Sequence, residues 1–187
     1  WGDAAAVIPW QMYMTYVDEE ILREQYTSMK MWVDYITAET KVPNLWAGCW
    51  HYGDWLALDA YQGSYRGASR EDIVATAYYA YSTELLVKAG KVLHEEVSQY
   101  EALYENIVKT FRQTYPEDIT QTEHVLALQF GLAEDRQKTA DSLVKTIRKA
   151  GRMETGFIGT PYLLHALSDN GYAEVAYELL LRGEYPA

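Results

Sequence analysis

Residues 51–59 bring together side chains that could bind a polar ligand. This short segment contains an imidazole, two carboxylates and an indole, which belong to His51, Asp54, Asp59 and Trp55. An indole can cover the apolar C–H face of a sugar ring, and carboxylates accept hydrogen bonds from sugar hydroxyls. A loop rich in Trp and Tyr can equally close a hydrophobic core while pairing its N–H and O–H groups. The segment therefore indicates either a sugar-binding surface or the lid of a core.

The aromatic composition of the chain leaves the same two alternatives open. Its 187 residues include 17 Tyr and 6 Trp but only 3 Phe, so most aromatic side chains carry a polar group. Such side chains suit a polar cleft, although a helix bundle with half-buried Tyr would have the same composition. The apolar fraction of 49% and the charged fraction of 23% are typical of one folded unit, which we expect to span residues 1–187.

Charge and apolar patterning exclude several classes of partner. The net charge of −11, with no basic stripe, argues against a nucleic-acid partner. No uncharged apolar run approaches the roughly 18 to 20 residues that cross a bilayer, so we expect a soluble chain without a membrane partner. Cys49 is the only cysteine, which excludes an intrachain disulfide and a cysteine-based metal site and slightly favours the cytoplasm.

The two ends of the sequence resemble cuts within a longer chain. The apolar pattern starts at Trp1 without an initiating Met or a signal peptide, and residues 184–187 follow directly on an apolar helix. Natural domain ends are usually polar and loose. We therefore expect a segment of a larger domain, whose unfinished helix faces could lead to self-association.

Helical spacing of apolar residues extends along the whole chain, and no stretch alternates for long enough to predict a strand. Buried helices are predicted for residues 3–16, 73–93, 120–132 and 160–167. Each is followed by a predicted amphipathic helix, at residues 19–37, 95–115, 133–150 and 172–181. Asp18 and Thr120 have the side chains and positions of N-caps, and Ser69 with Asp72 forms a helix-start pattern. Pro9 predicts a kink or a late start of the first helix.

Four repeats of a buried helix and an amphipathic helix are typical of two concentric layers. An α-solenoid also pairs its helices, but its repeats have near-constant length and these do not. The pattern favours an all-α fold of the α/α toroid type, with about four of the six helix pairs of an (α/α)6 barrel. Loops at one end of the inner helices would form the mouth of a cleft. Besides residues 51–59, the segments expected there are 1–3, 120–124 and 156–162, although caps and turns alone could account for each of them.

Several motifs follow one another in a specific order. They are Trp-Gly-Asp-Ala (residues 1–4), Ile-Pro-Trp (8–10), Met-Lys-Met-Trp-Val-Asp-Tyr (29–35), His-Tyr-Gly-Asp-Trp-Leu-Ala-Leu-Asp (51–59), Ala-Thr-Ala-Tyr-Tyr-Ala-Tyr-Ser-Thr-Glu-Leu (75–85), Thr-Gln-Thr (120–122), Thr-Gly-Phe-Ile-Gly-Thr-Pro-Tyr-Leu-Leu (155–164) and Ala-Tyr-Glu-Leu-Leu-Leu (176–181). In this order they resemble the catalytic (α/α)6 barrel of the α-L-rhamnosidases, glycoside hydrolase family 78, over nearly the whole chain. The resemblance implies a hydrolase that removes terminal α-L-rhamnose from glycosides with inversion and without a cofactor or metal.

Inversion needs one carboxylic acid to protonate the leaving oxygen and one carboxylate to activate water, roughly 6.5 to 9.5 Å apart. The resemblance implies that the acid lies a few residues before the position of Asp3 and the base beyond residues 185–186. Both would then be outside this chain.

The resemblance also implies a set of substrate-binding residues within the chain. Asp3 corresponds to a carboxylate on the rhamnose hydroxyls, and Trp55 to the stacking platform. His51 and Asp54 correspond to supporting polar groups, and Trp1 belongs to the same motif as Asp3.

Three alternatives remain open from the sequence. Asp3 could itself be the general acid, since it is the only motif carboxylate near the expected place. The chain could be a catalytically silent sugar-binding or scaffold fragment of a toroid, or part of a toroid enzyme that acts on another sugar. If Trp55 and Asp54 face the same cavity as Asp3, the sugar-binding interpretation is favoured.

Overall fold

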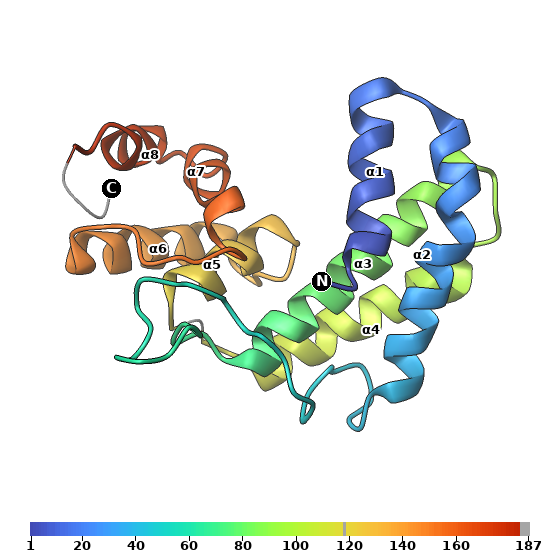
Figure 1. Ribbon diagram of the computed structural model, residues 1–187, viewed down its shortest axis with the longest axis horizontal. Coiled ribbons are helices and arrows are strands. Elements are labelled where there is room, and N and C mark those ends of the chain that lie inside the picture. The colour runs from blue at the N-terminus through green and yellow to red at the C-terminus, as the bar shows by residue number, and fades with distance from the viewer. Residues whose placement is uncertain (118, 184–187) are drawn as a thin grey trace.

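A computed structural model describes residues 1–117 and 119–183, which form eight helices and, apart from isolated bridges, no strands (Figure 1). The helices are α1 (Ala4–Tyr16), α2 (Glu19–Glu39), α3 (Glu71–Val92), α4 (Ser98–Thr114), α5 (Gln121–Gln129), α6 (Arg136–Ala150), α7 (Thr160–Ser168) and α8 (Ala173–Leu180). Each corresponds to a helix predicted from the sequence, so the prediction of an all-α chain is confirmed.

Consecutive helices pair into four hairpins, which are α1 with α2, α3 with α4, α5 with α6, and α7 with α8. Each odd-numbered helix also packs against the next odd-numbered helix, so that α1, α3, α5 and α7 form a continuous inner row. The even-numbered helices cover this row from outside. Figure 1 shows the first two hairpins on one side of the molecule and the last two on the other. This arrangement is that of an α/α toroid segment, as predicted.

Burial distinguishes the inner helices from the outer ones. In α5 every residue from Gln121 to Leu128 is buried, and α3 is buried along most of its length. The outer helix α4 instead buries only one stripe, formed by Tyr100, Ile107 and Phe111. Helices α3 and α5 are therefore buried on several sides by their neighbours, as their apolar pattern predicted.

Helix α1 does not follow this rule, and the prediction that it is buried is wrong. Only Ala6 and Pro9 are buried in it, whereas Ile8 is 58% exposed and Met14 is 59% exposed. Helices α2 and α3 contact α1 and cover only part of its circumference in the described structure. The helix begins at Ala4, so Pro9 lies inside it and does not delay its start.

The N-caps agree with the sequence at two of three positions. The Asp18 side chain accepts a hydrogen bond from the Glu20 backbone N–H, and Thr120 accepts one from Glu123. The prediction that Ser69 starts the third helix is wrong. The N-cap residue of α3 is Arg70, one position after Ser69. The Ser69 hydroxyl instead lies 2.7 Å from that of Thr120.

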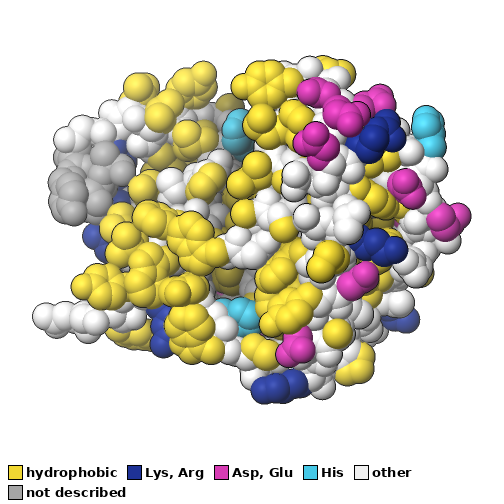
Figure 2. All heavy atoms as spheres, turned by 45° about the vertical axis from the view of Figure 1, so that its right-hand side comes forward, with side chains coloured by type: hydrophobic (Ala, Val, Ile, Leu, Met, Phe, Trp, Pro, Cys, Tyr) yellow, Lys and Arg dark blue, Asp and Glu magenta, His cyan; other side chains and the backbone are white. Residues whose placement is uncertain are grey.

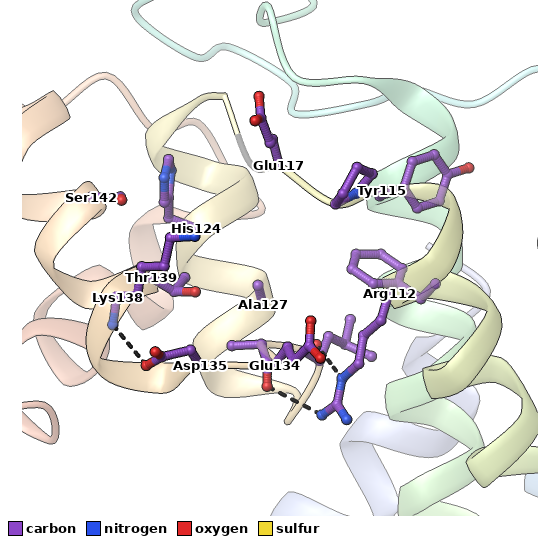
Figure 3. Close-up of a pocket in the computed structure, with 14 residues that line it drawn as sticks. Arg112, Tyr115, Glu117, His124, Ala127, Glu134, Asp135, Lys138, Thr139 and Ser142 are labelled. Carbon is purple, nitrogen blue, oxygen red and sulfur yellow. Dashed lines mark hydrogen bonds between the residues drawn. The ribbon is translucent and has the colours of Figure 1, made fainter.

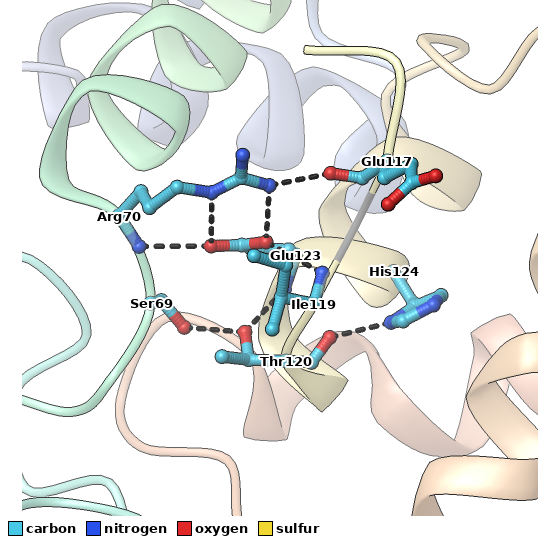
Figure 4. Close-up of polar contacts among 7 residues, drawn as sticks. All are labelled: Ser69, Arg70, Glu117, Ile119, Thr120, Glu123 and His124. Atoms are coloured by element: carbon cyan, nitrogen blue, oxygen red, sulfur yellow. Dashed lines mark hydrogen bonds and ion pairs between the residues drawn. The ribbon is translucent and has the colours of Figure 1, made fainter.

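The start of α3 is tied to the start of α5 by a buried ion pair (Figure 4). Glu123 is fully buried, and its carboxylate accepts hydrogen bonds from the guanidinium and the backbone N–H of Arg70. The Ile119 N–H donates a further bond at 2.8 Å. Burial alone would raise the pKa of Glu123, but these donors and the positive charge of Arg70 outweigh it and lower the pKa. The carboxylate is therefore ionised at neutral pH.

Hydrophobic side chains are abundant on the molecular surface. On the face in Figure 2 they greatly outnumber charged side chains, which gather toward the right-hand side. No helix within residues 1–117 and 119–183 is long and apolar enough to cross a membrane.

Replacement of Glu123 by Gln should lower the free energy of unfolding by about 2 kcal/mol at neutral pH. This is less than the roughly 3 to 5 kcal/mol typical of breaking a fully buried pair, because the Arg70 side chain is 37% exposed. Since the folded state lowers the Glu123 pKa, this stabilisation is present above about pH 4.3 and is lost as the pH falls through the folded pKa. Urea titrations at several pH values measure it. The exposed Glu105→Gln variant is the control, and equal stability of the two variants at neutral pH would contradict the account.

Candidate functional site

A cavity of about 860 Å³ lies between the start of α1, the loop of residues 40–70, α3 and the start of α7. Its walls are mainly aromatic, and five of the six Trp residues of the chain line it. Its aromatic lining consists of Trp1, Trp32, Trp46, Trp50, Tyr52, Trp55, Tyr78, Phe157 and Tyr162. Among the described residues that line it, Asp3 is the only one with a carboxylate. The cavity is thus an apolar pocket with few polar groups, which is typical of small-molecule sites.

Asp3 lies immediately before α1, and neighbouring side chains fix its orientation. Its Oδ1 accepts hydrogen bonds from the Trp32 Nε1–H at 3.0 Å and from the Ser82 hydroxyl at 2.8 Å. Within the described structure no donor contacts Oδ2. One carboxylate oxygen is therefore held by the protein, and the other is left for a ligand hydroxyl.

Trp55 lies in the same cavity as Asp3, as the sugar-binding interpretation requires. Its indole stacks on Tyr65, with ring centres 5.5 Å apart and planes 30° apart, and meets the edge of Tyr52. Its backbone carbonyl accepts a hydrogen bond from Phe157 at 3.0 Å, which joins this loop to the segment before α7. Ring stacking and backbone pairing together hold the indole in place.

His51 lines the cavity and has a buried ring nitrogen. Its Nε2 has no hydrogen-bond partner among the described residues, although its ring packs edge-on against Trp46 with centres 4.9 Å apart. Burial lowers the His51 pKa, and the nearby charges of Asp72, Glu71 and Asp3 oppose this only in part. The imidazole is therefore neutral at pH 7. A buried nitrogen without a protein partner is suited to a hydrogen bond with a ligand.

Asp54 does not face the cavity, which corrects its expected place beside Trp55 in the sugar site. It is fully buried, and its carboxylate accepts hydrogen bonds from the Thr122 hydroxyl and from the Gly156 and Ile158 N–H groups, the last two at 2.8 and 2.9 Å. Asp54 lies in a bend after Gly53, which has a φ of 62°, and its side chain turns inward whereas that of Trp55 lines the cavity. Asp54 therefore supports the cavity wall and has no direct access to a ligand.

Two Tyr residues in the cavity were not singled out from the sequence. Tyr78, on α3, and Tyr162, on α7, both line the cavity and interact with each other, and burial is the first cause that raises the pKa of both. Their side chains meet across the gap between two inner helices that are distant in sequence. The available signals were motif membership, since Tyr78 lies in the motif of residues 75–85 and Tyr162 in that of residues 155–164, and the place of Tyr162 in the segment 156–162 expected at the mouth of the cleft. Trp1 also lines the cavity, but its side chain is 83% exposed.

The described residues contain no group of three or more His, Cys, Asp or Glu side chains arranged to hold a metal ion. A single oriented carboxylate, a neutral imidazole and aromatic walls can bind an uncharged polyhydroxyl ring. They can do so by hydrogen bonds on one side and by apolar contact on the other.

Paired inner and outer helices around an aromatic cavity are the arrangement of an α/α toroid segment. The chain belongs to the family described as the bacterial α-L-rhamnosidase six-hairpin glycosidase domain, whose family model matches residues 1–187. It is 34% identical over 199 residues to an α-L-rhamnosidase of Formosa agariphila and 34% identical over 196 residues to one of Streptomyces avermitilis. These matches include 100% of this chain but 21% and 18% of those proteins, so the chain spans about a fifth of their length.

Solved structures agree with this assignment. The crystal structure of the Streptomyces avermitilis α-L-rhamnosidase complexed with L-rhamnose is similar with a TM-score of 0.89 and 33% identity, over 100% of this chain and 18% of that one. The native α-L-rhamnosidase of Aspergillus terreus is similar with a TM-score of 0.91 and 32% identity, over 100% of this chain and 23% of that one. The predicted toroid segment and family are therefore confirmed.

Gly156→Ala should lower the free energy of unfolding by about 2 kcal/mol, because the site has no room for another atom. An added Cβ would lie 2.4 Å from the Trp55 carbonyl oxygen, 2.6 Å from the Ala57 nitrogen and 2.7 Å from Asp54 Oδ1. Thermal and urea unfolding measure the loss. Gly183→Ala, where an added Cβ meets nothing within 4 Å, is the matched control. A Gly156→Ala chain as stable as this control would show that the wall is less tightly packed than described.

Proposed function

We propose that the cavity binds a terminal α-L-rhamnosyl group and forms part of the substrate cleft of an inverting α-L-rhamnosidase. The observation that carries the proposal is that the Asp3 carboxylate and the Trp55 indole line one cavity. The similar Streptomyces avermitilis structure, which is described as a complex with L-rhamnose, supports the choice of sugar. An apolar cavity with one oriented carboxylate also suits a deoxy sugar, whose methyl group adds apolar surface.

In this proposal the sugar hydroxyls donate to Asp3 Oδ2, which the protein leaves without a donor. The neutral His51 imidazole accepts a hydrogen bond from a further sugar hydroxyl at Nε2, the buried nitrogen that has no partner among the described residues. The Trp55 ring covers an apolar face of the sugar. These residues would orient the substrate, which is the role that positioning groups have in lowering a reaction barrier.

The acid and the base of inversion are proposed to lie outside this chain. Inversion needs two carboxyl groups roughly 6.5 to 9.5 Å apart, and Asp3 is the single carboxylate among the cavity residues of the described structure. The Trp32 and Ser82 donors hold the Asp3 carboxylate in one orientation, as a substrate-binding group requires. Residues 185–186, beyond which the base is expected by resemblance, lie outside the described residues.

L-rhamnose should quench or shift the Trp fluorescence of the 187-residue chain, because five of its six Trp residues line the cavity. Trp55→Ala should weaken binding by about 3- to 10-fold through loss of the apolar ring contact. Tyr61→Ala is the control, since Tyr61 is in the same loop, is 78% exposed and does not line the cavity. An unchanged L-rhamnose affinity of the Trp55→Ala chain would contradict the proposed stacking of the sugar on Trp55.

Asp3→Asn should weaken L-rhamnose binding roughly tenfold, because hydrogen bonds to a charged group are stronger than those to an amide. Calorimetry measures the affinity, with the exposed Asp169→Asn chain as control. A chromogenic α-L-rhamnoside should show no turnover with the original chain or with the Asp3→Asn chain. Turnover that Asp3→Asn abolishes would mean that the acid lies within this chain. Absence of any sugar binding would instead favour a catalytically silent scaffold.

L-rhamnose binding should be constant at pH values above about 7 and should weaken below about pH 6.5. Burial lowers the His51 pKa, so the imidazole stays neutral through the upper range, and its protonation in acid removes the proposed acceptor at Nε2. Calorimetric titrations at several pH values test this. His51→Gln should remove the acid-side change in affinity. A pH profile identical to that of the original chain would contradict the role of His51.

A further inference from the structure

A second hollow lies on the outer side of the helix pairs, between α4, α5 and α6 (Figure 3). We call it the outer groove and define it by His124, Thr139, Ser142, Phe111 and Tyr115. Its volume is about 310 Å³, and it shares no lining residue with the cavity of Asp3. This size is at the lower end of the range of ligand pockets and suits one sugar ring.

His124 is the most informative residue of the outer groove. The residue is 4% exposed, and its Nδ1 lies 2.6 Å from the backbone carbonyl oxygen of Thr120. A carbonyl oxygen can only accept, so Nδ1 carries the proton and Nε2 presents a lone pair. Burial lowers the pKa of His124 and so favours this neutral form.

The second ring nitrogen of His124 has no protein partner. No hydrogen bond to Nε2 occurs within the described structure, and the residue lines the outer groove. Figure 4 shows the imidazole with one nitrogen bonded to Thr120 and the other directed away from the Arg70 and Glu123 cluster. An acceptor on a side chain that is more than nine-tenths buried therefore faces the groove, where only a ligand or water can donate to it.

The walls beside His124 offer complementary groups. Thr139 and Ser142 are three residues apart on α6 and so lie on the same side of the helix. Both line the groove, and neither hydroxyl has a hydrogen bond within the described residues. On the side of α4 the groove is lined by Tyr115, which is partly exposed, and by Phe111, which is 3% exposed and packs in the core. Hydroxyls and a lone pair on one side, with the Tyr115 ring on the other, match the two kinds of surface of a sugar.

The charges around the outer groove do not favour an ionic ligand. The Arg112 guanidinium is occupied by the carbonyls of Gly131, Leu132 and Ala133. The Asp135 carboxylate caps α6. The remaining ionic side chains, Glu117, Glu134 and Lys138, have both signs. A single imidazole is also too few ligands for a structural metal site, since the described residues hold no group of three metal-binding side chains.

We propose that the outer groove is a second binding site for an uncharged sugar ring, in which a sugar hydroxyl donates to His124 Nε2. Thr139 and Ser142 exchange hydrogen bonds with neighbouring hydroxyls, and the Tyr115 ring covers the apolar face. This site is independent of the function proposed for the Asp3 cavity. It would hold a remote part of a glycan on the outside of the barrel wall.

Nitrogen-detected NMR of the four His side chains tests the proposal in the 187-residue chain. The His124→Gln variant assigns the His124 signals. We expect saturable shifts of the His124 Nε2 signal with L-rhamnose, D-glucose or D-galactose, with a dissociation constant on the order of millimolar. Shifts confined to His51 would report the Asp3 cavity alone and would overturn the proposal. Saturation by inorganic phosphate or Zn²⁺ without saturation by any of the three sugars would also overturn it.

A conservative variant separates binding from folding. Ser142→Ala should weaken the sugar affinity measured at His124 by about fivefold, the usual effect of losing one hydrogen bond. Ser168→Ala, at an exposed position at the end of α7, should leave it unchanged. The Trp fluorescence response to L-rhamnose should be the same in both variants, because Ser142 does not line the Asp3 cavity. Equal sugar affinity at His124 in the two variants would contradict the assigned contacts.

Discussion

The cavity depends on one buried carboxylate, that of Asp54. It accepts hydrogen bonds from a hydroxyl on α5 and from two backbone N–H groups of the segment before α7, and it is fully buried. A buried charge is stable only when such donors surround it. Because the three donors come from parts of the chain about 70 to 100 residues further along the sequence, the carboxylate fixes the loop that carries Trp55 against two inner helices.

The other buried polar contacts extend the same principle around the inner helices. Glu123 joins the beginnings of α3 and α5, and the hydroxyls of Ser69 and Thr120 meet beside this ion pair. These directional hydrogen bonds join segments that are distant in the sequence. Asp3 lies in the opposite situation, since one of its oxygens is held by Trp32 and Ser82 and the other is open to the cavity. The polar groups that fix the fold are saturated, whereas those proposed for binding are not.

The sequence predicted the helices, their pairing and the family, because helical periodicity and the order of the motifs are visible in the sequence itself. It predicted less about side-chain direction. Asp54 and Trp55 are adjacent in one motif yet face opposite ways, and only the partners of Asp54 on α5 and before α7 reveal this. Apolar composition likewise suggested that α1 is buried, but composition does not say which neighbours are present. Tyr78 lies in a motif noted in the sequence, and His124 lies in a segment expected at the mouth of the cleft. Only long-range packing shows that Tyr78 lines the Asp3 cavity and that His124 lines the outer groove instead.

A crystal structure of this chain with L-rhamnose tests the central claim most directly. The account predicts one sugar in the cavity, with a hydroxyl within hydrogen-bond distance of Asp3 Oδ2 and an apolar face against the Trp55 indole. Water or no ordered density at that position, at a sugar concentration that saturates binding in solution, would contradict it. A sugar bound with its ring away from both Asp3 and Trp55 would contradict it equally.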